Sequence, residues 1–151
     1  PLMERILSEG RHALPGFQEL ILQPQSEVSK VREYVRNTGY KIVDEDMILE
    51  DGKYYPMFRC VPCADNSAWD NMDETTVTVC DLYGPVLIKN GNPVLRKFLV
   101  REHHKLAAIM QQLRTQEMSD SIMDRIEQIN EMMAYNEAAY STMGAIRNAG
   151  I

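Results

Sequence analysis

Residues 40–62 decide the fold, and they read YKIVDEDMILEDGKYYPMFRCVP. Two runs rich in β-branched, aromatic and other apolar residues flank the dipeptide Asp51-Gly52. A two-residue turn between strands needs positive φ at both central positions, which Asp followed by Gly tolerates well. The sequence therefore predicts two antiparallel strands over 40–50 and 53–62.

A strand and a helix are expected upstream of this hairpin. The run Leu20-Ile21-Leu22 is bounded by prolines and a glycine, which is typical of a parallel strand buried on both faces of a sheet. Ser26 is the expected cap of a helix whose apolar residues recur at helical spacing, and Asn37-Thr38-Gly39 ends it. Residues 64–76 are polar and aperiodic, which predicts a surface loop. The fold class expected for residues 1–83 is therefore α/β.

Residues 84–151 predict a different architecture, an antiparallel helical coiled-coil hairpin. From Pro93, which suits a first helical turn, apolar residues follow a heptad pattern to Leu113, with Glu102 in one polar slot. After a polar break at 115–117, a second helix spaces its seam residues by three and four: Ile122, Ile126, Ile129, Met133, Asn136, Tyr140 and Met143. Asn136 in that seam would help to fix the register of the two helices.

The net charge of −6 would argue against a nucleic-acid partner, but the charge is strongly segregated. Residues 40–83 carry −7, residues 86–114 carry +5 and residues 115–143 carry −5.

No apolar run approaches the length of a membrane span and no secretion signal is visible, so we expect a cytosolic protein without a membrane partner. The start at Pro1, with a helix-like stretch from Leu2 to Leu7 and no cap before it, suggests a piece of a longer protein.

Three cysteines provide the one motif that names a chemistry by itself. Cys60 and Cys63 form a C-x-x-C pair, which can exchange disulfides or bind zinc. Zinc would require Cys80 and one of His103 or His104 as well, and the pair precedes a loop rather than a helix. We therefore expect cysteines that pack at strand ends and no metal site. The sequence also contains no glycine-rich phosphate loop and no hydrolase or metalloprotease motif, so no catalytic residue is identified.

The strongest candidate for a partner surface is a basic set on the first predicted helix of the hairpin. Lys97, Arg101 and Lys105 are spaced by four, so they form one stripe that could follow a phosphate backbone. Lys89, Arg96 and Arg114 add to the positive charge of this segment. The alternative is that these cations pair with the acidic second helix and bind nothing else.

The sequence also resembles a known family. The residues that carry the resemblance are Glu19-Leu20-Ile21-Leu22-Gln23-Pro24, Val31-Arg32-Glu33-Tyr34, Ile48-Leu49-Glu50-Asp51-Gly52-Lys53-Tyr54-Tyr55, Tyr83-Gly84-Pro85-Val86-Leu87, Asn92-Pro93-Val94-Leu95 and Phe98-Leu99. In order and spacing they resemble the second half of bacterial tRNA (adenine-22-N1)-methyltransferases, from the start of the chain to about residue 114. Pro56 and Gln25 depart from the family's usual acidic residue and Asn.

The resemblance implies a class I S-adenosylmethionine-dependent methyltransferase that modifies tRNA. Residues 1–83 would be the C-terminal part of its Rossmann-like catalytic domain, and residues 84–151 a coiled-coil domain that helps to grip tRNA. Gln23 and Pro24 would line the substrate side of the cleft, because ligands of open α/β sheets bind at the carboxyl ends of strands. The cofactor-binding motifs would lie upstream, so we expect residues 1–151 alone to be inactive and to associate, as a homodimer, to cover exposed sheet.

Two other functions compete with an RNA methyltransferase. A non-enzymatic hairpin that binds a protein partner would need its seam intact but not its basic stripe. A thiol or zinc protein would contain bound metal or an oxidised pair of Cys60 and Cys63.

Overall fold

The computed structural model describes residues 18–63, 65 and 67–148. The chain divides into two compact units, Pro1–Leu87 and Ile88–Ile151. The helix-like stretch from Leu2 to Leu7 lies outside the described residues. Of the helices that are described, none has the length and apolar composition needed to cross a membrane.

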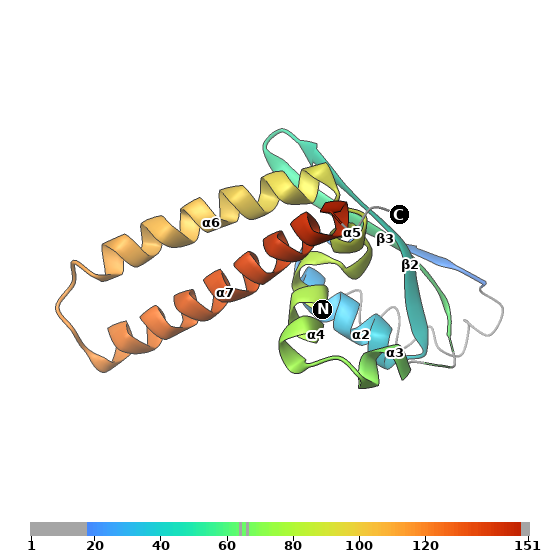
Figure 1. The fold of residues 1–151 in the computed structure, drawn as a ribbon, viewed down its shortest axis with the longest axis horizontal. Helices are drawn as coiled ribbons and strands as arrows, with labels where there is room; N and C mark the ends of the chain where they lie inside the picture. The colour runs from blue at the N-terminus through green and yellow to red at the C-terminus, as the bar shows by residue number, and fades with distance from the viewer. Residues whose placement is uncertain (1–17, 64, 66, 149–151) are drawn as a thin grey trace. The chain divides into compact units, whose positions relative to one another are not determined.

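The first unit contains a three-stranded sheet (Figure 1). Its strands are β1 (Leu20–Leu22), β2 (Tyr40–Glu50) and β3 (Lys53–Pro62), in the order β1-β3-β2. The predicted hairpin is confirmed with the expected strand limits, and its turn residues Asp51 and Gly52 have φ of 48° and 73°. Positive φ at both positions is the geometry that the Asp-Gly dipeptide predicted.

The prediction of a parallel strand at Leu20–Leu22 is wrong within the described residues. β1 pairs antiparallel with β3, and Leu20 lies opposite Cys60. Ile21 is 72% exposed, so β1 is not buried on both faces. A short apolar run indicates a strand, but it does not indicate whether the neighbouring strand runs parallel or antiparallel. The predicted parallel pairing was wrong for this reason.

Pro56 lies in β3, which is the central strand of the sheet, although a proline is expected only at a sheet edge. β1 pairs only with residues 58–60 of β3, so Pro56 lies beyond the stretch where β3 has two neighbours. Its missing N–H therefore costs little, because among the described strands only β2 pairs with this part of β3.

A β-bulge changes which residues of β2 face the core. Ile42 lies opposite Cys60 and Asp44 lies opposite Arg59, so Val43 is an extra residue in β2. The bulge shifts the alternation of the strand, and Glu45 then lies opposite the buried Phe58. A charged side chain is thereby directed into the core.

Helices cover one side of this sheet (Figure 1). Helix α2 (Val28–Asn37) buries Val31 and Val35 against Phe58, and it is followed after the hairpin by α3 (Ser67–Asp70), α4 (Glu74–Tyr83) and α5 (Pro85–Lys89). The prediction that Ser26 caps α2 is wrong. The N-cap is Glu27, which has a left-handed backbone conformation and forms no side-chain hydrogen bond as a cap.

The loop predicted over residues 64–76 is in part wrong, because it contains α3 and the start of α4. Asp73 caps α4 by accepting a hydrogen bond from the N–H of Thr76. Four-residue and five-residue helices are too short to show a helical period, which is why α3 and α5 were not predicted.

The second unit contains the predicted helical hairpin. Helices α6 (Pro93–Leu113) and α7 (Asp120–Asn148) run antiparallel and are joined by a short loop (Figure 1). Asn92 caps α6 by accepting hydrogen bonds from the N–H groups of Val94 and Leu95. The seam buries five residues of α6 and, among the described side chains of α7, Ile129, Asn136, Ala139 and Met143.

A buried ion pair joins the elements of the first unit. Arg32 Nε of α2 lies 2.9 Å from Glu45 Oε1 of β2, and the two side chains are 2% and 0% exposed. Glu45 Oε2 also accepts hydrogen bonds from the N–H groups of Val86 and Leu87, at 2.8 and 3.3 Å, at the start of α5. Burial raises the pKa of the Glu45 carboxyl, while Arg32 and these two N–H groups oppose the rise.

The same pair fixes the end of α4 and explains the glycine that follows it. Arg32 Nη1 donates to the carbonyl oxygens of Asp81 and Leu82, each at 3.1 Å. Gly84 has a φ of 94°, and a Cβ at this position would lie 2.7 Å from a carboxylate oxygen of Glu45. Only glycine fits both the conformation and the contact.

Candidate nucleic-acid interface

The loop at the carboxyl end of β1 holds the two residues predicted to line a substrate cleft. Gln23 is exposed directly after the strand, and Pro24 is buried. The loop leads into α2 through Glu27, whose carboxylate binds Lys30. The structure therefore makes the Gln23 side chain accessible, whereas Pro24 has a packing role. Their role toward a substrate stays a prediction.

The basic residues predicted to bind phosphate lie on α5, on α6 and at the C-cap of α6, and they differ in exposure. Lys97, Arg101 and Lys105 are exposed on α6, and we call these three residues the basic stripe. Lys89 is exposed at the end of α5, and Arg114 is exposed at the C-cap of α6. The stripe thus presents three cations at spacings of four residues on one helix.

Arg96 lies apart from the stripe and is half-buried. Its guanidinium carbon lies 5.0 Å from the centre of the Tyr140 ring of α7. A guanidinium over an aromatic face at this distance forms a cation–π contact. Arg96 therefore contacts a ring of the second helix, and the phosphate binding predicted for it stays a prediction.

The sequence left open that acidic residues of α7 neutralise the cations of α6. For Lys97 and Lys105 the structure does not support that alternative. Among the residues that the structure describes, neither Lys97 nor Lys105 forms an ion pair with an acidic side chain. Their charges are free to attract an anionic partner.

Asn136 occupies the seam of the hairpin, as predicted. Its amide nitrogen donates to the carbonyl oxygen of Leu99 at 3.0 Å and to Glu102 Oε2 at 2.9 Å. Asn136 is buried, so a shift of one helix along the other would leave its amide without these acceptors. The polar slot of α6 and the polar residue of α7 therefore meet and fix the register.

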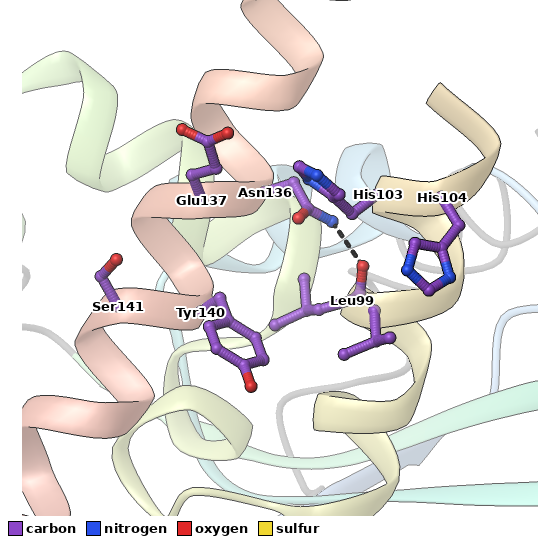
Figure 2. A pocket seen from close by; sticks show the side chains of 8 residues that line it. Leu99, His103, His104, Asn136, Glu137, Tyr140 and Ser141 are labelled. Carbon is purple, nitrogen blue, oxygen red and sulfur yellow. Dashed lines mark hydrogen bonds between the residues drawn. The ribbon is translucent and has the colours of Figure 1, made fainter. Parts of the chain in front are cut away.

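Beside this polar contact the two helices enclose a groove of about 430 Å³, which we call the hairpin groove (Figure 2). From α6 it is lined by Leu99, Val100, His103 and His104. From α7 it is lined by Asn136, Glu137, Tyr140 and Ser141. Figure 2 shows the Tyr140 ring projecting from α7 toward α6, with Glu137 and Ser141 on the outer side of α7.

Tyr140 was predicted in the seam, but it is 40% exposed and Ala139 takes the seam position. Ala139 and Tyr140 follow Asn136 by three and four residues, so both fit the spacing of seam positions. The smaller residue, Ala139, is the one that is buried in the seam. A small residue allows close approach of the two helices, and the large ring is displaced to the groove. The groove itself was missed because its residues come from two helices and form no linear motif.

The cysteines are free thiols. Burial raises the pKa of Cys60 to about 12 and that of Cys80 to about 11. Cys63 is half-buried and its Sγ lies 3.0 Å from the carbonyl oxygen of Asp65. In the part of the chain that the structure describes, no three His, Cys, Asp or Glu residues form a group that could hold a metal ion.

The turn after β1 does not fit a site for S-adenosylmethionine. Such a site in an open α/β sheet uses a glycine-containing turn after a strand and the N-terminus of the following helix. After β1, the corresponding turn contains Pro24 and leads to an acidic N-cap, Glu27. No step that uses this cofactor is therefore assigned to these residues.

Comparisons with known proteins agree on one family. The family model described as tRNA (adenine(22)-N(1))-methyltransferase matches residues 1–137. A protein of that description from Bacillus subtilis is 27% identical, and the match covers 87% of this chain and 57% of the relative. The chain thus spans a little over half the length of the curated relative that it matches.

Solved structures give the same result for the fold. A crystal structure of the M1A22 tRNA methyltransferase from B. subtilis matches with a TM-score of 0.75 and 26% identity, over 92% of this chain and 58% of that one. A putative tRNA (m1A22) methyltransferase from Streptococcus pneumoniae, in complex with S-adenosyl-L-methionine, matches with a TM-score of 0.60 and 26% identity, over 87% and 55%. A protein of the NADB-Rossmann superfamily from Streptococcus agalactiae matches with a TM-score of 0.72 and 18% identity, over 92% and 55%, so the α/β fold corresponds to part of a Rossmann-like structure. The chain belongs to the tRNA (adenine(22)-N(1))-methyltransferase family.

Proposed function

We propose that this protein takes part in methylating N1 of adenine 22 in tRNA, and that the described chain supplies surfaces that hold the RNA. The observation that carries the proposal is the match of the family model to residues 1–137. That match covers the α/β unit and the helical hairpin as far as residue 137 of α7.

In this proposal the basic stripe binds tRNA phosphates. Its three exposed cations lie within nine residues of one helix, and cations so arranged can follow a nucleic-acid backbone. Gln23 lies at the carboxyl end of β1, where it would line the substrate side of the cleft. Lys89 and Arg114 would extend the positive surface.

S-adenosylmethionine is the methyl donor of the proposed reaction, and the S. pneumoniae relative is described in complex with it. Because the turn after β1 does not fit its site, we assign donor binding to the part of the relatives' length that this chain does not span. We expect residues 1–151 alone to transfer no methyl group. Cytosolic location follows from the same proposal, because tRNA is its substrate.

The test of RNA binding uses two pairs of charge reversals that change the net charge equally. One variant carries Lys97→Glu and Lys105→Glu in the stripe, and the control carries Lys41→Glu and Lys53→Glu, both exposed in the β2–β3 hairpin. We would measure the Kd for a tRNA transcript over a series of salt concentrations. The slope of log K against log salt falls by about 0.7–0.9 for each phosphate contact that is lost.

The stripe variant should bind tRNA more weakly and with a slope reduced by about 1.5. The control variant should keep the wild-type slope. Equal losses in both variants would show that only net charge matters, and unchanged binding in both would favour a hairpin that binds a protein partner instead.

A further inference from the structure

The hairpin groove combines an apolar floor, an aromatic ring and polar groups at its rim. Val100, which is 40% exposed, contributes apolar surface beside the buried Leu99, and Tyr140 presents a ring that is also 40% exposed. Arg96 contacts that ring and so limits its movement. A fixed aromatic ring at an open groove is a platform on which another flat ring can stack.

The groove also borders the basic stripe along α6. Val100 follows Lys97 by three residues, and His104 follows Arg101 by three. Side chains three residues apart are neighbours on the surface of a helix. One wall of the groove is therefore continuous with the exposed cations, and a ligand in the groove would have its anionic part within their reach.

We propose that the hairpin groove binds one unpaired nucleobase of RNA, stacked on Tyr140, while the adjoining phosphates lie on the basic stripe. This inference rests on the proposed function, since it adds a base-binding site to the surface that holds tRNA. Sequence-specific RNA recognition commonly takes bases from single-stranded segments and stacks them on aromatic side chains.

The chemistry of the groove favours this ligand. Its volume of about 430 Å³ lies within the range of small-molecule sites. The ring nitrogens of His103 and His104, which line the groove on α6, can donate or accept hydrogen bonds to the edge of a base. The adjacent positive charge selects an anion-linked ring over an apolar peptide side chain.

The test compares three substitutions by their effect on the Kd for a tRNA transcript. Tyr140→Ala removes the ring, and Tyr140→Phe keeps it. Tyr135→Ala removes another tyrosine of α7, one that does not line the groove and whose hydroxyl donates to Glu131 on its own helix. Circular dichroism would establish that each variant keeps its helices.

Tyr140→Ala should weaken tRNA binding by at least about fivefold, which is the lower range for loss of one base stacked on an aromatic ring. Tyr140→Phe and Tyr135→Ala should bind within about twofold of the wild type. If a folded Tyr140→Ala binds tRNA as the wild type does, while reversal of Lys97 and Lys105 still weakens binding, the base site is wrong and the proposed function stands. If neither change weakens binding, both fail.

Photocrosslinking to the unmutated chain tests the site without a substitution. A tRNA transcript that contains 4-thiouridine would be irradiated with the protein, and the modified residues identified by mass spectrometry. Crosslinks at Tyr140 or His104 are expected. Crosslinks confined to other parts of the chain would overturn the base site, including in the case that Tyr140→Ala does not fold.

Discussion

Replacing Arg32 by Met should destabilise the α/β unit by about 3 kcal/mol or more, because it removes one partner of a buried ion pair. The carboxylate of Glu45 would keep the N–H groups of Val86 and Leu87 but lose its cationic neighbour at 2.9 Å. The carbonyl oxygens of Asp81 and Leu82 would lose a donor as well. Glu45→Gln should cost a similar amount, because it leaves the Arg32 charge buried and uncompensated.

The double variant shows whether the two side chains stabilise the unit as a pair or independently of each other. With both charges removed, no buried charge is left unpaired, so Arg32→Met with Glu45→Gln should cost less than the sum of the single costs by about 2 kcal/mol or more. Costs that add to within about 0.5 kcal/mol would refute the reasoning, since independent sites are additive to that extent.

The assay is urea unfolding followed by two signals. Trp69, the single tryptophan of the chain, lies in the first unit and contacts Arg36, so its fluorescence reports unfolding of that unit. Circular dichroism reports the helices, and most of the helical residues belong to α6 and α7 of the second unit. The three variants should shift the fluorescence transition more than the dichroism transition.

The pH dependence of the Arg32→Met variant follows from the pKa of Glu45. Burial already raises this pKa above its ordinary value of 4.5, and loss of Arg32 removes the charge that opposes the rise. A carboxyl with a raised pKa in the folded state contributes its full stabilisation at pH values below its pKa in the unfolded state. That contribution is lost as the pH rises through the folded-state pKa. The loss of unfolding free energy in Arg32→Met, relative to the wild type, should therefore be small near about pH 4 and grow toward neutral pH. A deficit that does not change with pH would contradict this assignment.

Three other predictions concern glycine geometry, thiol reactivity and association. Gly84→Ala should cost at least about 1 kcal/mol more than Gly91→Ala in urea unfolding, because both glycines have positive φ but only Gly84 has a carboxylate within 3 Å of the new Cβ; equal costs would contradict the clash. Cys63 should react with iodoacetamide at neutral pH well before Cys60 and Cys80, whose pKa values of about 12 and 11 keep them protonated; equal rates would show that burial does not protect them. Residues 1–151 should sediment as a dimer at micromolar concentration, because the edge strand β1 exposes apolar surface; a monomer would contradict the expectation.

The parts of the fold that could be predicted are those set by local sequence. The Asp51-Gly52 turn fixed the limits of both hairpin strands, and the heptad pattern predicted α6 and α7. The partner direction of β1 could not be predicted, because its neighbour β3 lies some 40 residues away in sequence. The short helices between β3 and α6 lacked a visible period.

The sites that could not be predicted depend on contacts between distant segments. The pair of Arg32 and Glu45 requires the bulge at Val43, which no sequence signal marks. The hairpin groove requires Tyr140 to lie outside the seam, and that choice is made by the packing of Ala139. The basic stripe was predicted because it follows the period of a single helix.

The most direct test of the account is to map the methyl group in tRNA after reaction with the complete product of the gene that encodes this sequence. A tRNA transcript with adenine at position 22 would be incubated with S-adenosylmethionine and analysed by mass spectrometry, beside a transcript with guanine at that position. We expect one N1-methyladenine, at position 22, and no methylation of the guanine transcript. Absence of methylation, or methylation at another position, would contradict it.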